Sequence, residues 1–192
     1  MKKLSSKYDV VLIGGSSGSL ISIIKILESF EENIDLSVII VLHQLKENSD
    51  RMRELLSGKT KVKTIIPNDK EIILKNRIYI APPDYHLMIE KEQTFSYSFE
   101  DPINYSRPSI DLLFETAACA YGNRIIGILL SGSNSDGTKG LKKIRSFGGL
   151  SIVQDPCTAD FPQMPESAIK NSGVDHVLSV KKIINYLTKT II

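Results

Sequence analysis

The segment Val10–Leu20 reads VVLIGGSSGSL, in which four apolar residues pass directly into glycines and serines. Continuous apolar runs of this kind are typical of parallel strands that are buried on both faces. Small residues at the end of such a strand can let the backbone approach a phosphate, or they can form a tight turn that exposes a serine nucleophile. The rest of the sequence must therefore show which of these two functions the loop has.

Runs of β-branched residues alternate along the chain with segments of helical spacing, a pattern typical of α/β folds. With 192 residues, 42% of them hydrophobic, the chain is expected to form one domain over residues 1–192. We predict a three-layer α/β/α architecture, with a doubly wound, mostly parallel sheet and a small antiparallel hairpin insert within residues 80–99. The predicted strands are Asp9–Ile13, Leu36–Leu42, Val62–Ile66, Glu71–Leu74, Arg77–Ile80, Arg124–Leu130 and Leu150–Gln154, and the predicted helices are residues 20–27, 49–56, 109–121, 137–147 and 181–192.

Charge and hydropathy exclude several kinds of partner. The 24 basic residues nearly balance the 22 acidic ones and form no basic block, so we expect neither nucleic-acid binding nor attachment to an anionic membrane. No apolar run approaches the ~18 residues that span a bilayer, and the run before Gly14 is too short for a signal peptide. Cys119 and Cys157 lie far apart without CxxC spacing. We therefore expect a cytoplasmic protein without membrane insertion.

Reactive side chains follow three of the predicted strands. Ser16, Ser17 and Ser19 follow the first strand, His43 follows the second, and Asp136 follows the strand that reads RIIGILL. Because the carboxyl ends of parallel strands meet at one edge of the sheet, we expect these residues to lie close together. A serine, a histidine and an aspartate are the components of a nucleophile, a general base and a group that orients the base.

Each of these residues also has an interpretation without catalysis. The sequence GGSSG can hold a pyrophosphate at a helix N-terminus, as in a Rossmann-like module, although His43 and Gln44 stand where such a module normally has an acidic residue for the ribose. His43 can simply cap a strand. Asp136 can be the N-cap of the helix that follows it. The residues alone leave these alternatives open.

Six motifs in the same order resemble the catalytic domain of the chemotaxis protein-glutamate methylesterases. The resemblance runs from about Tyr8 to Val180 and so covers nearly the whole chain. The motifs are IGGSSGS after the first strand, VIIVLH at the second, YIAPPDYHL, SRPSIDLLF, LLSGSNSDG, and GGLSIVQDP followed by MPESAI.

The resemblance implies a function for five residues. Ser16 matches the nucleophile of that family, His43 its general base and Asp136 the third member of its triad, and the backbone amides of Ser17 and Ser133 match its oxyanion donors. The implied reaction is hydrolysis of glutamate γ-methyl esters on the cytoplasmic helices of chemoreceptors, with deamidation of glutamines as a second activity. The family requires no cofactor and no metal.

Two departures from the family pattern qualify these expectations. The loop from Gly132 to Gly137 reads GSNSDG where the family has GMGADG, and we expect Asn134 to keep the turn in a left-handed conformation. The family also carries an N-terminal receiver domain, whereas this chain starts at the catalytic strand. We therefore expect a separate receiver-domain regulator, and a substrate that is a methylated chemoreceptor or another methyl-esterified protein. The alternatives are a nucleotide-binding Rossmann-like module and a catalytically weak binding or signalling domain.

Overall fold

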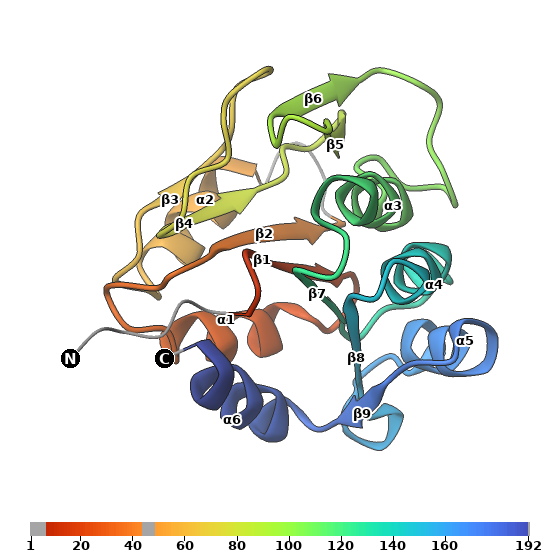
Figure 1. Cartoon of the computed structure of the whole chain (residues 1–192). Helices are drawn as coiled ribbons and strands as arrows, with labels where there is room; N and C mark the ends of the chain where they lie inside the picture. The colour runs from red at the N-terminus through yellow and green to blue at the C-terminus, as the bar shows by residue number, and fades with distance from the viewer. Residues whose placement is uncertain (1–6, 44–48, 192) are drawn as a thin grey trace.

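The structure is a computed structural model that describes residues 7–43 and 49–191 (Figure 1). Its main element is a parallel sheet of seven strands in the order β3-β4-β2-β1-β7-β8-β9. The strands are β1 (Val10–Gly15), β2 (Ser37–Leu42), β3 (Thr64–Ile65), β4 (Arg77–Ile80), β7 (Ile125–Leu129), β8 (Leu150–Gln154) and β9 (His176–Leu178).

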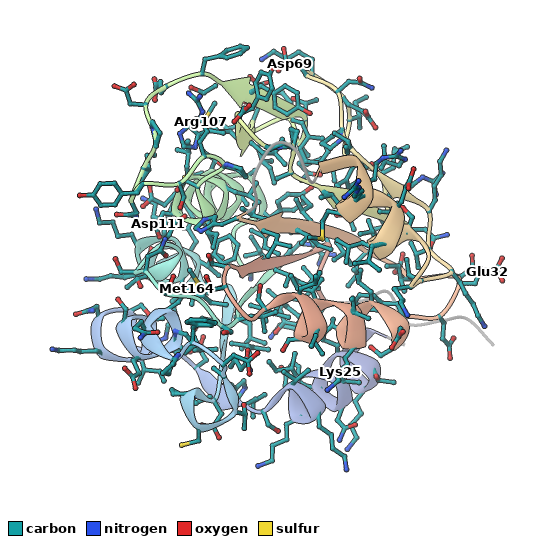
Figure 2. The ribbon with its side chains drawn as sticks, turned by 180° about the vertical axis from the view of Figure 1, so that it is seen from behind. Lys25, Glu32, Asp69, Arg107, Asp111 and Met164 are labelled. Carbon is teal, nitrogen blue, oxygen red and sulfur yellow. The ribbon has the colours of Figure 1, made fainter. Side chains whose placement is uncertain are left out.

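Helices cover both faces of this sheet, which explains why its central strands are apolar throughout. One face packs against α1, α2 and α6, and the other packs against α3, α4, α5 and the antiparallel hairpin of β5 and β6. In Figure 2, Lys25 lies with α1 and α6, whereas Asp111 and Met164 lie on the side of α3 to α5. The elements are α1 (Leu20–Glu28), α2 (Ser49–Ser57), α3 (Ile110–Tyr121), α4 (Thr138–Ser146), α5 (Gln163–Ser172), α6 (Val180–Ile191), β5 (His86–Ile89), β6 (Phe95–Ser98) and a 3-10 turn (Pro156–Thr158).

The strand order places the functional edge of the sheet. From β1 the chain adds β2 on one side, and much later it adds β7 on the other side. The carboxyl ends of these three strands are therefore neighbours at the point where the direction of winding reverses. Ligands and catalytic residues of open α/β sheets collect at this position.

The predicted fold class is confirmed, and most predicted elements are present within a few residues of their expected bounds. The hairpin begins at His86, beyond the two prolines of the insert, because a proline has no amide hydrogen for a strand ladder. The segment Glu71–Leu74 is not a strand and contributes only an isolated bridge between Ile72 and Thr94. Helix α5 and strand β9 were not predicted, and the last residue of the predicted final helix, Ile192, lies outside the described residues.

Candidate active site

The loop after β1 is held from two directions. The backbone N–H of Ser16 donates to the carbonyl oxygen of Ser131 at 3.0 Å. The hydroxyl of Ser19 donates to the carbonyl oxygen of Ser16 at 2.6 Å. Gly18 has a φ of +75° and packs so closely that an added Cβ would lie 2.7 Å from the Cβ of Asp160. Ser16 is therefore carried on a fixed turn and not on a loose loop.

His43 lies directly beside this turn. Gly15 of β1 pairs with Leu42 of β2, and the backbone N–H of His43 donates to the carbonyl oxygen of Gly15 at 3.2 Å. Neighbouring strands are about 4.8 Å apart, so the backbones of Ser16 and His43 are adjacent. Side chains alternate between the faces of a strand, and this alternation assigns both residues to the face that α3 covers. Within residues 7–43 and 49–191, the Ser16 hydroxyl has no hydrogen-bond partner.

Asp136 is the third residue that the sequence analysis selected, and the structure brings it onto His43. Its Oδ2 atom lies 3.0 Å from Nε2 of His43, and its side chain is 0% exposed, against 11% for His43. The same carboxylate accepts the backbone N–H groups of Ile110 at 2.7 Å and Asp111 at 3.0 Å, and the hydroxyl of Ser109 at 3.1 Å. The carboxylate thus occupies the N-terminus of α3, where the helix dipole favours negative charge.

Opposing effects determine the ionisation of Asp136. Burial raises the pKa of the carboxyl group, but hydrogen bonds from His43 and from the amides of Ile110 and Asp111 outweigh burial and hold the pKa below its usual value. An ionised Asp136 accepts Nε2–H of His43, which leaves Nδ1 as the ring nitrogen that can accept a proton. The interpretation of Asp136 as the N-cap of the next helix is wrong, because Gly137 is the N-cap residue of α4 and the Asp136 carboxylate binds the start of α3.

The segment before α3 supplies contacts that the sequence analysis did not predict. The hydroxyl of Ser106 lies 3.2 Å from Nδ1 of His43, and the amide nitrogen of Asn134 lies 3.4 Å from the same hydroxyl. Asn104 donates to Asp136 at 3.3 Å. These residues precede a helix instead of following a strand, so the strand-end argument could not find them. The only signal was the motif SRPSIDLLF, which begins at Ser106.

A second carboxylate lies next to Asp136. Asp111 accepts the backbone N–H of Gly140 at 2.8 Å and the amide of Asn104 at 3.2 Å. Burial, together with the negative charge of Asp136, raises the pKa of Asp111 to about 6, although the bond from Gly140 acts in the opposite direction. The pKa of Asp111 is therefore raised while that of Asp136 is lowered, and Asp136 is the carboxylate that contacts His43.

The loops of Ser17 and Ser133 meet above the ends of β1 and β7. Their hydroxyl oxygens lie 3.4 Å apart. In the part of the chain that the structure describes, the backbone N–H groups of Ser17 and Ser133 have no protein acceptor. The expected left-handed conformation of Asn134 is wrong, because Gly137 has the positive φ in this loop, at 87°. Asn134 holds the turn with its side chain instead, which accepts the N–H of Asp136 at 3.1 Å.

Comparison with known proteins identifies the family. The sequence profile of the CheB methylesterase family matches residues 11–187. This chain belongs to the CheB methylesterase family. A Leptospira interrogans protein, provisionally named a protein-glutamate methylesterase/protein-glutamine glutaminase, is 43% identical over 176 residues, which are 92% of this chain and 91% of that protein.

Other relatives agree with the assignment of this CheB family member. A protein-glutamate methylesterase/protein-glutamine glutaminase from Trichodesmium erythraeum is 29% identical over 98% of this chain, which spans 54% of that longer protein. The crystal structure of the Thermotoga maritima CheB methylesterase catalytic domain superposes with a TM-score of 0.89 at 29% identity, covering 95% of this chain and 98% of that one. The names of these relatives support an enzyme with methylesterase and glutaminase activity.

One strained residue of this CheB family member lies at the mouth of the site. Tyr105 has a φ of 62° and follows Asn104, whose φ is 50°. The side chain of Tyr105 is 103% exposed, while Asn104 and Ser106 on either side of it bind Asp136 and His43. A bulky residue in the left-handed region is an outlier that often marks function.

The described part of this CheB family member contains no group of three His, Cys, Asp or Glu side chains that could hold a metal ion. No helix among residues 7–43 and 49–191 has the length and apolar content that crossing a bilayer requires. Gln44, which the sequence analysis considered at the second strand, lies outside the described residues.

Proposed function

We propose that the chain hydrolyses glutamate γ-methyl esters on methylated chemoreceptors, and deamidates glutamines there, through Ser16, His43 and Asp136. The observation that supports this most strongly is the 3.0 Å contact between His43 Nε2 and a fully buried Asp136. This pair lies at the end of the strand that neighbours the Ser16 strand. Membership of the CheB methylesterase family supports the same chemistry.

In the proposed mechanism, Asp136 holds Nε2–H of His43 so that Nδ1 accepts the proton of the Ser16 hydroxyl. The serine oxygen attacks the ester carbonyl, and the backbone N–H groups of Ser17 and Ser133 stabilise the oxyanion of the tetrahedral intermediate, each contributing about 3 kcal/mol. His43 then gives its proton to the departing methoxide, which leaves as methanol. Water hydrolyses the acyl-enzyme by the same steps and releases the glutamate side chain.

Ser106 raises a question about the nucleophile, because its hydroxyl already lies 3.2 Å from Nδ1 of His43. The contacts from Ser106 to His43 and from His43 to Asp136 form a serine–histidine–aspartate chain that does not include Ser16. We assign the nucleophile to Ser16 because it follows the glycine turn of β1 and because its hydroxyl has no other partner among the described residues. In this assignment, the Ser106 hydroxyl is hydrogen-bonded to Nδ1 of His43 in the resting enzyme, and this bond breaks when Nδ1 accepts the proton of Ser16.

Two matched variants separate these serines. With a methyl-esterified receptor fragment as substrate, Ser16→Ala should reduce methanol release at least about 1000-fold, because the nucleophile is gone. Ser106→Ala should retain activity within about tenfold, because only a contact of the base is lost. A fluorophosphonate should label Ser16. Full activity of Ser16→Ala, or loss of labelling in Ser106→Ala alone, would overturn the assignment.

The proposed partners are methylated chemoreceptors or other methyl-esterified proteins, with a separate receiver-domain protein as regulator, and the proposed location is the cytoplasm. The exposed free thiols of Cys119 and Cys157 support a reducing compartment. The methanol-release assay and a thermal-shift measurement with a dinucleotide together decide between the alternatives. If the parent releases no methanol and a dinucleotide raises its melting temperature, the chain is a nucleotide-binding module instead. Absence of both effects would indicate a binding or signalling domain.

A further inference from the structure

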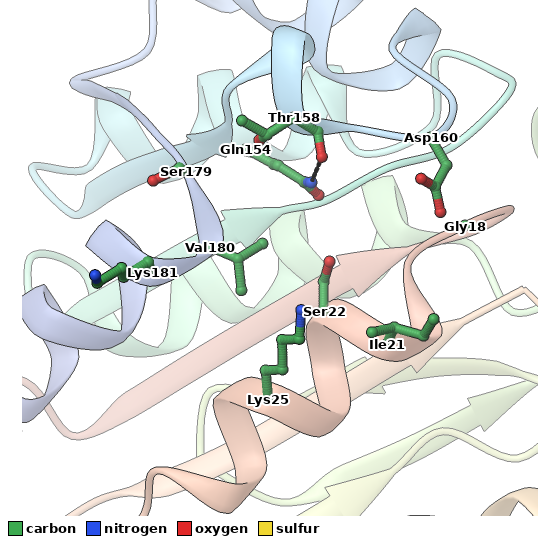
Figure 3. Close-up of a pocket in the computed structure, with 10 residues that line it drawn as sticks. All are labelled: Gly18, Ile21, Ser22, Lys25, Gln154, Thr158, Asp160, Ser179, Val180 and Lys181. Carbon is green, nitrogen blue, oxygen red and sulfur yellow. Dashed lines mark hydrogen bonds between the residues drawn. The ribbon is translucent and has the colours of Figure 1, made fainter.

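A pocket lies on the opposite side of the Ser16 loop from His43, and we refer to it as the α1–α6 pocket. It has a volume of about 430 Å³ and is bounded by α1, the end of β8 and the start of α6 (Figure 3). Gly18 lines one end of it, so the loop that carries Ser16 forms part of its wall. Gln154 closes the floor, with its amide nitrogen bonded to the carbonyl oxygen of Thr158 at 2.9 Å.

Ser22 is a buried polar residue that the protein leaves unsatisfied. It is 9% exposed, and its hydroxyl points into the pocket in Figure 3. No hydrogen-bond partner for this hydroxyl occurs within the described ranges 7–43 and 49–191. Buried hydroxyls normally have a partner, and leaving one unsatisfied costs free energy. A ligand in the pocket would supply the missing partner.

Positive charge lies beside this hydroxyl. The ammonium group of Lys25 is directed toward Ser22 in Figure 3, and Lys25 makes no ion pair with any described residue. The first amides of α6 have no acceptor within their helix, because the first backbone bond of that helix is from Ile183 to Ser179. Lys181 also borders the pocket but points away from it in the same view. This end of the pocket is suited to a carboxylate or another oxyanion.

Negative charge lies at the other end. Asp160 lines the pocket next to Gly18, and its carboxylate has no partner in the described part of the chain. A multiply charged anion such as phosphate would be repelled there. A ligand with a carboxylate at one end and an ammonium group at the other would satisfy both ends.

We propose that the α1–α6 pocket binds a small zwitterion of the amino-acid class. Its carboxylate accepts hydrogen bonds from Ser22 and Lys25, and its ammonium group donates to Asp160. The proposal uses none of Ser16, His43 and Asp136, so it stands or fails separately from the proposed hydrolase activity.

The experiment screens the full chain against the standard L-amino acids at millimolar concentration by thermal shift and then measures the best binder by calorimetry. We expect saturable binding of at least one amino acid. The matched analogue that lacks the α-ammonium group should bind at least about tenfold more weakly, because the contact with Asp160 is lost. The proposal would be overturned if no amino acid binds saturably, if the analogue binds as tightly as the amino acid, or if inorganic phosphate binds more tightly.

Variants locate the bound amino acid. Lys25→Met and Ser22→Ala should each weaken binding, Lys25→Met by about tenfold or more because a charge-assisted bond is removed. Lys63→Met, an exposed lysine before β3 at the far edge of the sheet, should bind as the parent does, and so should Ser16→Ala. Binding that is unchanged in Lys25→Met, or that is lost in Ser16→Ala, would place the ligand elsewhere and contradict the proposal.

Discussion

The two sides of the Ser16 loop differ in how their buried polar groups are satisfied. On the side of α3, the Asp136 carboxylate accepts hydrogen bonds from His43, from backbone amides and from Ser109. On the side of α1 and α6, the buried hydroxyl of Ser22 and the charge of Lys25 have no partner among the described residues. Groups that the protein itself satisfies are held in one position, as catalysis requires, whereas unsatisfied groups are available to a ligand.

Among the substitutions that compare the two sides, the largest effect is expected at the hydrogen-bonded Asp136. Asp136→Asn should reduce methyl-ester turnover about 10- to 1000-fold, because the ring of His43 loses the group that fixes its tautomer; in serine proteases the equivalent change costs about 10⁴-fold. The melting temperature should also fall, since an amide cannot accept every bond that the carboxylate accepts. Turnover is measured well below the melting temperature of both proteins. Asp111→Asn is the matched control, because Asp111 shares the start of α3 without touching His43, and its turnover should stay within a few-fold of the parent.

A smaller effect is expected at Tyr105, which lies at the mouth of the candidate active site. We expect the exposed ring of Tyr105 to contact the substrate away from the reacting atoms, so Tyr105→Ala should raise KM for a methylated receptor fragment about three- to tenfold and leave kcat nearly unchanged. Phe147→Ala, at the end of α4, is the control with an exposed aromatic ring remote from the site. An unchanged KM for Tyr105→Ala would show that the strained residue does not contact the substrate.

The ionisation of Asp111 gives a pH-dependent effect on stability. Its pKa is raised to about 6 in the folded protein, so the folded state binds this proton more tightly than the unfolded state. The group therefore destabilises the protein progressively as pH rises from about 4 to 6. The melting temperature of Asp111→Asn minus that of the parent should increase between pH 4.5 and 7.5, and a difference that is constant across this range would contradict the prediction.

Asp175 is the control of opposite sign. Burial raises its pKa, but the bonds from Arg145 and Ser151 outweigh burial and lower it. A lowered pKa stabilises the folded protein above the ordinary range of aspartate, and the stabilisation is lost as pH falls. Asp175→Asn should therefore be less stable than the parent at neutral pH, with a smaller deficit toward acid pH.

The smallest effect compares Ser19, whose hydroxyl has a partner within the Ser16 loop, with Ser22, whose hydroxyl has none among the described residues. The hydroxyl of Ser19 is bonded to the carbonyl oxygen of Ser16, so Ser19→Ala should lower the free energy of unfolding by about 1 kcal/mol while most activity remains. Ser22→Ala should leave stability unchanged or raise it by about 0.5 kcal/mol, because an unsatisfied hydroxyl is removed and alanine favours a helix. Chemical denaturation measures both. Equal destabilisation by the two substitutions would mean that Ser22 has a partner in the folded protein.

The sequence predicted the fold where the hydrophobic pattern was strong. The runs at β1, β2 and β7 are buried on both faces and contain β-branched residues, so their period was unambiguous. Helix α5 reads QMPESAIKNS, with few apolar residues and an internal proline, and β9 has only three residues. Both are stabilised by tertiary packing that a local pattern does not reveal.

In the site, the residues that follow strands were predictable from the sequence, and the residues that precede α3 were not. Ser16, His43 and Asp136 follow strands, and parallel topology alone brings strand ends together. Ser106 and Asn104 reach the site only because α3 begins there, a placement that depends on the Asp136 carboxylate binding the amide of Ile110. The roles of Ser17 and Ser133 as oxyanion donors stay a prediction, as does the organisation of residues 1–192 as one domain.

The position of β1 in the middle of the sheet has a consequence for synthesis of the chain. Asp9, just before β1, is bonded to Arg124, just before β7, across 115 positions of sequence, at 2.7 Å between Arg124 Nη2 and Asp9 Oδ1. Until the ribosome has delivered β7, one edge of a fully apolar strand lacks its neighbour and can pair with another chain. Growing chains that stop between β6 and β7 should therefore be those that chaperones retain and that aggregate most readily.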